Sequence, residues 1–353
     1  MKTLSLRRGL LAVCFLVATS LSCQLFGSGQ LPVERLPVSP ASATPTEAPA
    51  AEAPPDEPGP AEPTPTNPPE PEATQDEPEA IAEMESRPCK KESCVRNGSF
   101  LLGRPIGPDG RNTIVTAMRF GEFQPATKDA QTGVYFLNSE GTPVLAVADG
   151  EVVVAGDDSQ RPYGSVKGMY GNLVILEHSL PGSSEPLFTL YSHLSEVLVA
   201  VGDDVTTGQE IGLVGSTGSA TGSILLFEVR LGENNPTQAR NPELWLKPVR
   251  GEDGKRLGAL AGQILDADGN FIHVANIVLE QLAGPGLPPI DQFYLQTYSA
   301  TRLRGLSPWE ESFAIGDLPA GDYQISFMLD NVLHQQVVSV KPGKLTLVTI
   351  SVK

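Results

Sequence analysis

Two histidines in strand-like segments are the first side chains of this chain that could do chemistry. His178 ends an apolar run, and His193 follows Tyr191 and Ser192 in a second run. A neutral imidazole can ligate zinc or move a proton near neutral pH. With Glu228, from a third run, the two histidines could form a metal or acid–base site. A lone histidine on a strand is more commonly a hydrogen-bonded structural residue, and both interpretations stay open here.

Cysteines offer a second kind of chemistry. Cys89 and Cys94 lie in the segment Cys-Lys-Lys-Glu-Ser-Cys, and Cys14 and Cys23 lie near the N-terminus. In an oxidising compartment the 89–94 pair predicts a local disulfide. A zinc site is the alternative, but no second Cys or His pair lies nearby in the sequence.

The N-terminus has the pattern of a targeting segment. Basic residues precede the apolar run 10–21, which is too short for a typical membrane span. Ser20-Leu-Ser-Cys23 resembles the lipobox of bacterial lipoproteins, although Ser20 replaces the usual aliphatic residue. The resemblance implies lipidation at Cys23 and a membrane partner. Plain secretion after cleavage near residues 18–20, or an uncleaved anchor, are the alternatives, and all three place the chain outside the cytoplasm.

Charge and proline are concentrated in one segment. The net charge is −17, and residues 31–80 contain eleven acidic residues, one basic residue and fifteen prolines. Such a composition cannot form a core and favours extended polyproline II, on the order of 150 Å long for fifty residues. After residues 1–23 we therefore predict a disordered linker over 24–86. The remainder lacks a basic patch, which argues against a nucleic-acid partner.

The rest of the chain predicts two β-domains, so the fold class is all-β. Short apolar runs alternate with Gly, Asp, Asn and Pro turns. In the first domain, residues 87–250, we expect strands at 113–118, 144–148, 150–155, 173–177, 187–192, 210–214 and 224–230. In the second, residues 257–353, strands spaced as in a small β-sandwich are expected at 259–265, 272–280, 292–299, 311–316, 322–329, 332–340 and 344–352.

The stretch 208–230 organises the first domain. Glycines at 208, 212, 215, 218 and 222 separate two short apolar runs, as in close strands joined by tight turns. The second run, 224–227, is apolar on both faces and predicts a buried strand. If the domain has a groove, this strand is its floor and offers no reactive group.

An ordered set of motifs resembles the β-sheet core of the LytM-type (M23) peptidoglycan metallopeptidases over roughly residues 113–235. The motifs are Gly141-Thr-Pro-Val144, Ala146-Val-Ala-Asp-Gly-Glu-Val152, Gly171-Asn-Leu-Val-Ile-Leu-Glu-His178, Leu190-Tyr-Ser-His-Leu194, Val205-x-x-Gly-Gln-x-Ile-Gly212, Gly215-Ser-Thr-Gly218 and Phe227-Glu-Val-Arg230. Each motif is weak alone, and their shared order makes the resemblance specific.

The resemblance implies a zinc site whose ligands this sequence has replaced. The family binds one zinc through His-x-x-x-Asp and the second His of His-x-His. Gln131 and Tyr135 stand at the first two ligand positions and Leu226 at the third. Ile224 stands at a catalytic position, and only His193 matches a functional one. We therefore expect a domain without cofactor that binds peptidoglycan peptide or regulates a cell-wall hydrolase.

Two other functions remain as alternatives. One is an active zinc endopeptidase with relocated ligands that cleaves peptidoglycan cross-links. The other is a surface stalk or adhesin. The second domain resembles the carboxypeptidase regulatory-like or Cna-B-type (prealbumin-like) sandwich in Gly262-Gln-Ile-Leu-Asp-Ala-Asp-Gly269 and in residues 313–323. That resemblance implies either a spacer or a binding module.

Overall fold

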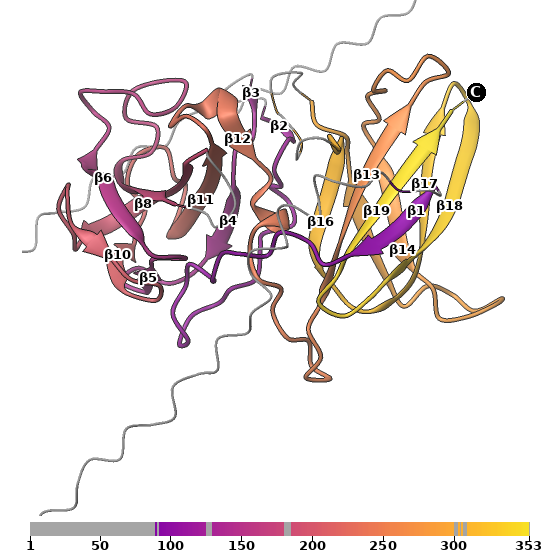
Figure 1. Ribbon diagram of the computed structural model, residues 1–353, viewed down its shortest axis with the longest axis horizontal. Coiled ribbons are helices and arrows are strands. Elements are labelled where there is room, and N and C mark those ends of the chain that lie inside the picture. Colours follow the sequence, from indigo (N-terminus) through magenta and orange to yellow (C-terminus); the bar gives the residue numbers. More distant parts are fainter. Residues whose placement is uncertain are drawn as a thin grey trace, which may run out of the picture. The chain divides into compact units, whose positions relative to one another are not determined.

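The computed structural model describes residues 89, 92–124, 129–179, 185–299, 303, 305 and 309–352 (Figure 1). The predicted targeting segment, the lipidation site Cys23 and the linker 24–86 lie outside these residues. The described part consists of β-strands and two 3₁₀ helices, η1 (Pro236–Gln238) and η2 (Pro242–Leu244). None of its helices is long and apolar enough to cross a membrane. The predicted all-β fold class is confirmed.

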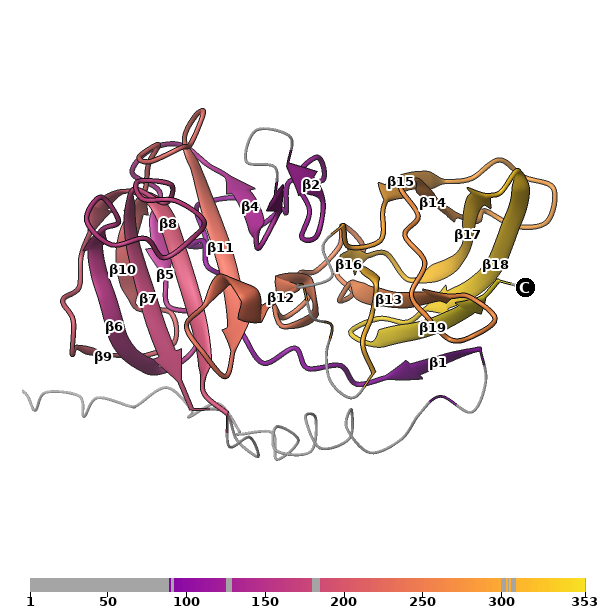
Figure 2. The ribbon, with the colours of Figure 1, turned by 90° about the horizontal axis from the view of Figure 1, so that it is seen from above.

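One antiparallel nine-stranded sheet builds the first domain. Its main path runs β12-β11-β8-β7-β6-β9; β4 joins β11, and β10 joins β5 and β8 (Figure 2). The strands are β4 (Val134–Leu137), β5 (Pro143–Leu145), β6 (Gly150–Asp157), β7 (Asn172–His178), β8 (Leu187–Val197), β9 (Asp204–Val205), β10 (Glu210–Val214), β11 (Ile224–Leu231) and β12 (Ala239–Arg240). A separate hairpin pairs β2 (Phe123–Gln124) with β3 (Asp129–Ala130).

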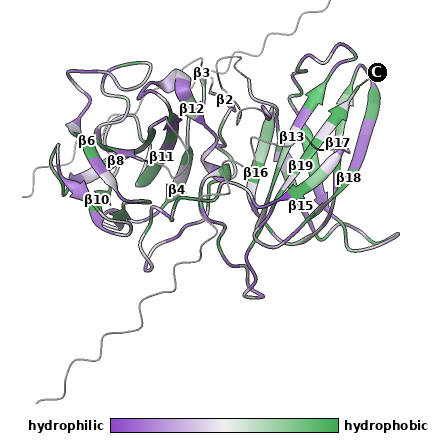
Figure 3. Cartoon of the chain, in the orientation of Figure 1, coloured by the Kyte–Doolittle hydropathy of each residue, from purple (hydrophilic) through white to green (hydrophobic). Residues whose placement is uncertain are grey.

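Strand β11 is buried on both faces, as its apolar sequence predicts. Leu225, Phe227 and Val229 pack into the main core of the domain. Because side chains alternate across a strand, Leu226 faces the other way, into a second apolar cluster. In Figure 3 part of this strand has the colour of hydrophobic residues. Residues 224, 226, 228 and 230 lie on this second face of β11, which carries the positions that the sequence analysis assigned to a site.

The C-terminal unit is a β-sandwich. One sheet has the order β1-β19-β13-β16 and the other β15-β14-β17-β18, and residues of both sheets share one core. The strands are β1 (Ser93–Arg96), β13 (Gly258–Leu265), β14 (Ile277–Gln281), β15 (Asp291–Leu295), β16 (Phe313–Leu318), β17 (Gly321–Leu329), β18 (Val332–Val340) and β19 (Leu345–Ser351).

The first strand of this sandwich comes from the N-terminal side of the first domain. β1 pairs antiparallel with β19, from Ser93 opposite Val348 to Arg96 opposite Leu345. Cys89 and Cys94 form a disulfide at the start of this strand. The range 87–250, which the sequence assigns to one domain, therefore supplies a strand to the other.

One predicted strand is wrong. Residues 113–118 form no strand, and only Ile114 makes an isolated bridge, to Phe136. Ile114 is buried, whereas Thr116 and Ala117 are exposed, so the run has no continuous buried face. Of the other six predicted strands, the one at 144–148 is shorter than expected, as β5 ends at Leu145, and the remaining five are present. The sequence did not predict β4, which pairs with β11.

Candidate functional site

Strand register brings three of the sequence-predicted positions together. Leu226 of β11 pairs with Tyr135 of β4 on one side and with Ser192 of β8 on the other. His193 follows Ser192, and its ring is stacked on the ring of Tyr135 with centroids 6.3 Å apart and planes 5° apart. Tyr135, His193 and Leu226 therefore belong to one place in the fold, as the resemblance implies.

Gln131 completes this group from the segment that leads into β4. With Thr132 and Tyr135 it lines a cavity of about 90 Å³. The other lining residues are Asp129, Ala130, Gly164, Ser165, Met169, Tyr170, Ser219 and Pro236. Burial raises the pKa of the Tyr135 hydroxyl, a hydrogen bond with Gln131 opposes the shift, and the charge of Glu228 adds to it. Tyr135 is therefore a neutral phenol at physiological pH.

Near this cavity, which we call the groove, β11 places hydrocarbon side chains at positions 224 and 226. Leu226 is fully buried and packs with Tyr170, Leu173, Ile175, Phe188 and Leu190. Ile224 is 8% exposed, and its N–H donates to the carbonyl of Gly215. Neither side chain has a lone pair or a proton to transfer, so positions 224 and 226 can neither bind a metal ion nor act as acid or base.

His193 is held by its backbone as well as its ring. Leu194 pairs with Asn172 and Ser192 with Leu173, so His193 is the extra residue of a β-bulge in β8. Its φ of 65° is left-handed, which is uncommon for a residue other than glycine. Nδ1 donates to the carbonyl of Thr217 at 2.9 Å. Burial lowers the pKa of the ring, so a neutral imidazole lies beside Tyr135.

A buried ion pair lies farther along the same face of β11. Glu228 and Arg230 are both fully buried, and the guanidinium donates to the carboxylate at 2.7 and 3.0 Å. Glu228 also accepts hydrogen bonds from Tyr170 at 2.7 Å and from Thr132 at 2.6 Å. Arg230 donates further to the carbonyl of Tyr163. Glu228 is therefore a structural anchor that joins β11 to two neighbouring segments.

His178 lies in a different hydrogen-bonded setting. Nδ1 donates to the carbonyl of Asp149 at 2.8 Å, and Nε2 is 2.7 Å from the hydroxyl of Thr189. Burial lowers the pKa of this ring too. Across the described residues, no three His, Cys, Asp or Glu side chains are arranged to hold a metal ion. The site of His178, His193 and Glu228 that the sequence suggested is therefore not formed.

Comparison with known proteins shows which family the sequence around this groove resembles. The sequence model of peptidase family M23 matches residues 129–240, the span that contains every groove residue named above. This chain carries an M23 domain.

Several curated proteins are similar to this chain over part of its length. The chain is 33% identical over 129 residues to an uncharacterized metalloprotease of Buchnera aphidicola (subsp. Baizongia pistaciae). It is 38% identical over 164 residues to the murein hydrolase activator EnvC of Escherichia coli K12, and 38% identical over 113 residues to the DD-carboxypeptidase/endopeptidase Mpg of Neisseria meningitidis serogroup B. These matches cover 35%, 45% and 31% of this chain and 31%, 34% and 23% of the relatives. The chain therefore spans about a third or less of their length.

The three side chains that the sequence resemblance assigns to a metal position do not fit zinc. Zinc in proteins takes neutral imidazole, thiolate or carboxylate ligands. Here the corresponding side chains are the amide of Gln131, the neutral phenol of Tyr135 and the hydrocarbon of Leu226. Only the amide oxygen and the phenol have lone pairs, and both are poor zinc ligands.

Sequence reasoning did not foresee that Thr132, Tyr170 and Arg230 hold Glu228. One signal for the ion pair was present, because Glu228 and Arg230 are two residues apart on a strand and so share a face. Tyr170 and Thr132 come from other segments, and no local pattern connects them with Glu228.

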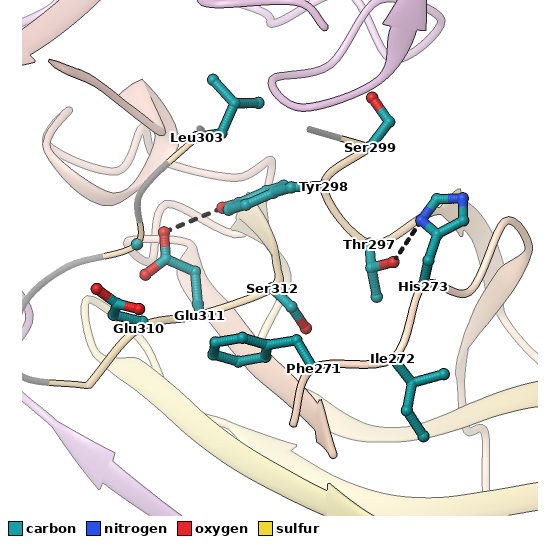
Figure 4. Close-up of a pocket in the computed structure, with 11 residues that line it drawn as sticks. Phe271, Ile272, His273, Thr297, Tyr298, Ser299, Leu303, Glu310, Glu311 and Ser312 are labelled. Atoms are coloured by element: carbon teal, nitrogen blue, oxygen red, sulfur yellow. Dashed lines mark hydrogen bonds between the residues drawn. The ribbon is translucent and has the colours of Figure 1, made fainter. Parts of the chain in front are cut away.

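A larger cavity, of about 250 Å³, lies in the C-terminal unit (Figure 4). Tyr298 donates to Glu311 at 3.0 Å and accepts from Asn241 at 3.1 Å, and Thr297 is hydrogen-bonded to His273 at 3.0 Å. Burial, followed by the charge of Glu311, raises the pKa of Tyr298 well above its usual value. Tyr298, Glu311, Thr297 and His273 are held by these hydrogen bonds, so we assign the cavity no chemistry.

Proposed function

We propose that the M23 domain binds a peptide of peptidoglycan or a cell-wall hydrolase through this groove and does not cleave its ligand. The observation that carries the proposal is Leu226. It stands at an M23 ligand position, directly opposite Tyr135, and is buried among apolar side chains. A metallopeptidase needs three protein ligands and an open position for water, and this strand supplies a hydrocarbon instead.

The groove retains polar groups suited to a peptide. Gln131 contributes an amide and Asp129 a carboxylate to the cavity wall. The hydroxyls of Ser165 and Ser219 donate to Asp129 and to the carbonyl of Met169, which leaves their oxygens as acceptors for a ligand. Neutral donors and acceptors match the N–H and C=O groups of an extended peptide. The carboxylate favours a ligand with an ammonium group nearby. The similarity to a protein named murein hydrolase activator supports a regulatory role.

The location that suits this function is the cell envelope. Signal-like residues 1–23, lipidation at Cys23 and the acidic, proline-rich linker 24–86 would place the groove outside the cytoplasm and at a distance from the membrane. The similarity to a relative named murein hydrolase activator supports the same compartment.

The test is to incubate the purified full chain with cross-linked peptidoglycan and follow two readouts, sedimentation of the chain with the polymer and release of soluble muropeptides. We expect sedimentation without release, or capture of a purified cell-wall hydrolase. Tyr135→Ala should weaken the interaction because it removes one wall of the groove. Tyr294→Ala, at a 66% exposed position of the C-terminal unit, is the matched control.

Each other outcome favours a different function. Muropeptide release that a chelator abolishes would establish a zinc endopeptidase with relocated ligands. Binding to neither peptidoglycan nor hydrolase would favour a stalk or adhesin.

A further inference from the structure

Strand β18 ends its sheet and is long and regular. Of the described residues, only those of β17 pair with it, along all nine positions and without a bulge. Val332, Leu333 and Val337 are each 55% exposed. Natural edge strands are commonly shortened, bulged, or protected by lysine or proline. β18 has none of these protections, so its free edge can accept another strand.

The turn before β18 determines which backbone groups lie on the free edge. Asp330 and Asn331 have φ angles of 50° and 62°, as in a two-residue type I′ turn. Such a turn closes on a hydrogen-bonded pair, here Leu329 and Val332. Because bonded and non-bonded pairs alternate, the even-numbered residues of β18 bond to β17. The odd-numbered residues therefore direct their N–H and C=O groups away from the sheet.

One hydrogen bond agrees with this alternation of odd and even residues. It also reduces the number of backbone groups of β18 that are available to a new strand. The carbonyl of Ser339 accepts a hydrogen bond from the hydroxyl of Thr346 at 2.8 Å. Position 339 is odd, so its carbonyl points outward as expected, but it is already used. Leu333, Gln335 and Val337 remain as the residues available for a new ladder.

The charge of β18 indicates its partner. The strand reads Val-Leu-His-Gln-Gln-Val-Val-Ser-Val and contains no Asp, Glu, Lys or Arg, in a chain with a net charge of −17. Two acidic chains repel each other least where neither surface is charged. The uncharged β18 of one chain can therefore pair with β18 of a second chain. We propose that two copies of this chain pair antiparallel through β18, about a two-fold axis at Gln335.

This register matches the side chains as well as the backbone. It places Gln335 opposite its own copy and Leu333 opposite Val337 of the other copy, so that apolar faces apolar and amide faces amide. The three residues of each copy donate and accept about six main-chain hydrogen bonds in total. A two-fold axis at Gln336 would instead require the occupied carbonyl of Ser339.

Sedimentation equilibrium of the purified full chain over a concentration series tests the pairing. The expected result is a monomer–dimer equilibrium that ends at the mass of two chains. A mass of one chain throughout, or a heterogeneous series of larger species, would overturn the proposal. A mass of one chain would mean that β18 does not pair with a second copy. A series of larger species would mean that the edge aggregates without forming a closed dimer.

A charge swap tests the register. Gln335→Lys and Gln335→Glu each put like charges directly opposite across the axis, so each should raise the dimer dissociation constant roughly two- to fivefold. An equimolar mixture should dimerise more tightly than either variant alone, because lysine then faces glutamate. Gln335→Pro removes the two central N–H donors at an edge that tolerates proline, and should weaken the dimer at least about tenfold.

Gln292→Lys is the matched control, since it makes the same change at an exposed position of β15, the opposite edge of the same sheet. It should leave the dimer unchanged. If Gln335→Lys dimerises like the unsubstituted chain, or if the mixture is no tighter than its components, the chains do not pair through this strand. This inference concerns the C-terminal unit and does not depend on the function of the groove.

Discussion

At the residue scale, a buried ion pair between Glu228 and Arg230 lies on the same strand as the buried Leu226. Glu228 and Arg230 are fully buried, and each has further hydrogen-bond partners. Burying two charges is costly, and the pair is stable only while both are present. Thr132 and Tyr170, which line the groove, are therefore held to β11 through Glu228. Removing either charge of the pair should lower the free energy of unfolding strongly.

We predict that Glu228→Gln lowers the free energy of unfolding by about 3–5 kcal/mol, because it leaves the guanidinium of Arg230 buried without a counter-charge. Arg230→Met should cost a similar amount. The double variant should cost clearly less than the two single costs together, since no unpaired charge remains. Urea denaturation of the four proteins measures this; additive single effects, or a loss below about 1 kcal/mol for either, would contradict the assignment.

The two buried histidines predict a pH dependence of stability. Burial lowers the pKa values of His178 and His193 in the fold. Between the folded and unfolded pKa values the unfolded chain binds more protons, so stability is fully present above the unfolded value of about 6.5 and is lost as the pH falls below it.

The melting temperature should therefore fall between about pH 7.5 and pH 5.5, and His178→Gln should reduce that slope. His273→Gln, at an exposed position, is the control and should leave the slope unchanged. A melting temperature that stays constant or rises on acidification over this interval would show that the buried rings do not control it.

At the element scale, the glycine-rich connection between β10 and β11 shapes the groove. Gly171 and Gly218 face each other, both with left-handed backbones, φ 66° and 70°. A Cβ on Gly218 would meet the backbone of Gly171, Met169 and Tyr170. A side chain at this position would therefore move the loop that carries the carbonyl partner of His193, at Thr217.

Gly218→Ala should accordingly destabilise the domain by roughly 2–4 kcal/mol, from the left-handed backbone together with overpacking. Gly222→Ala, in the same connection, should change stability by less than about 0.5 kcal/mol, since nothing lies within 4 Å of its added Cβ. Thermal or denaturant unfolding of both variants is the measurement. Equal effects at the two positions would mean that close backbone approach is not the reason for the glycine at 218.

Sequence alone was enough for most elements and for the group of Tyr135, His193 and Leu226 that strand pairing brings together. The glycine spacing at 208–222 and the apolar run at 224–227 predicted β10 and β11, because both depend on local chemistry. The run 113–118 was misjudged since apolar residues need a continuous face to make a strand. The bulge at His193 arises from the pairing of β8 with β7, which no local pattern records.

At the scale of the whole molecule, β1 links the N-terminal side of the chain to the C-terminal sandwich. Its ladder with β19 is short, and the Cys89–Cys94 disulfide lies at its start. Replacing both cysteines with serine should loosen this strand, by about 2 kcal/mol on loop-entropy grounds. Hydrogen exchange should become faster for the amides of β1 and stay unchanged in β7 and β8. Faster exchange throughout both domains would show that the disulfide stabilises more than this strand.

The central claim is that this M23 groove binds its ligand without metal chemistry. The most direct test of it is the zinc content of the purified full chain. Elemental analysis after dialysis against a zinc-containing buffer, with a trace-metal-free wash, gives the number of zinc ions per chain. Because the ligand positions hold Gln131, Tyr135 and Leu226, the predicted result is far less than one zinc per chain. One zinc per chain that is lost with Gln131→Ala or Tyr135→Phe would contradict it.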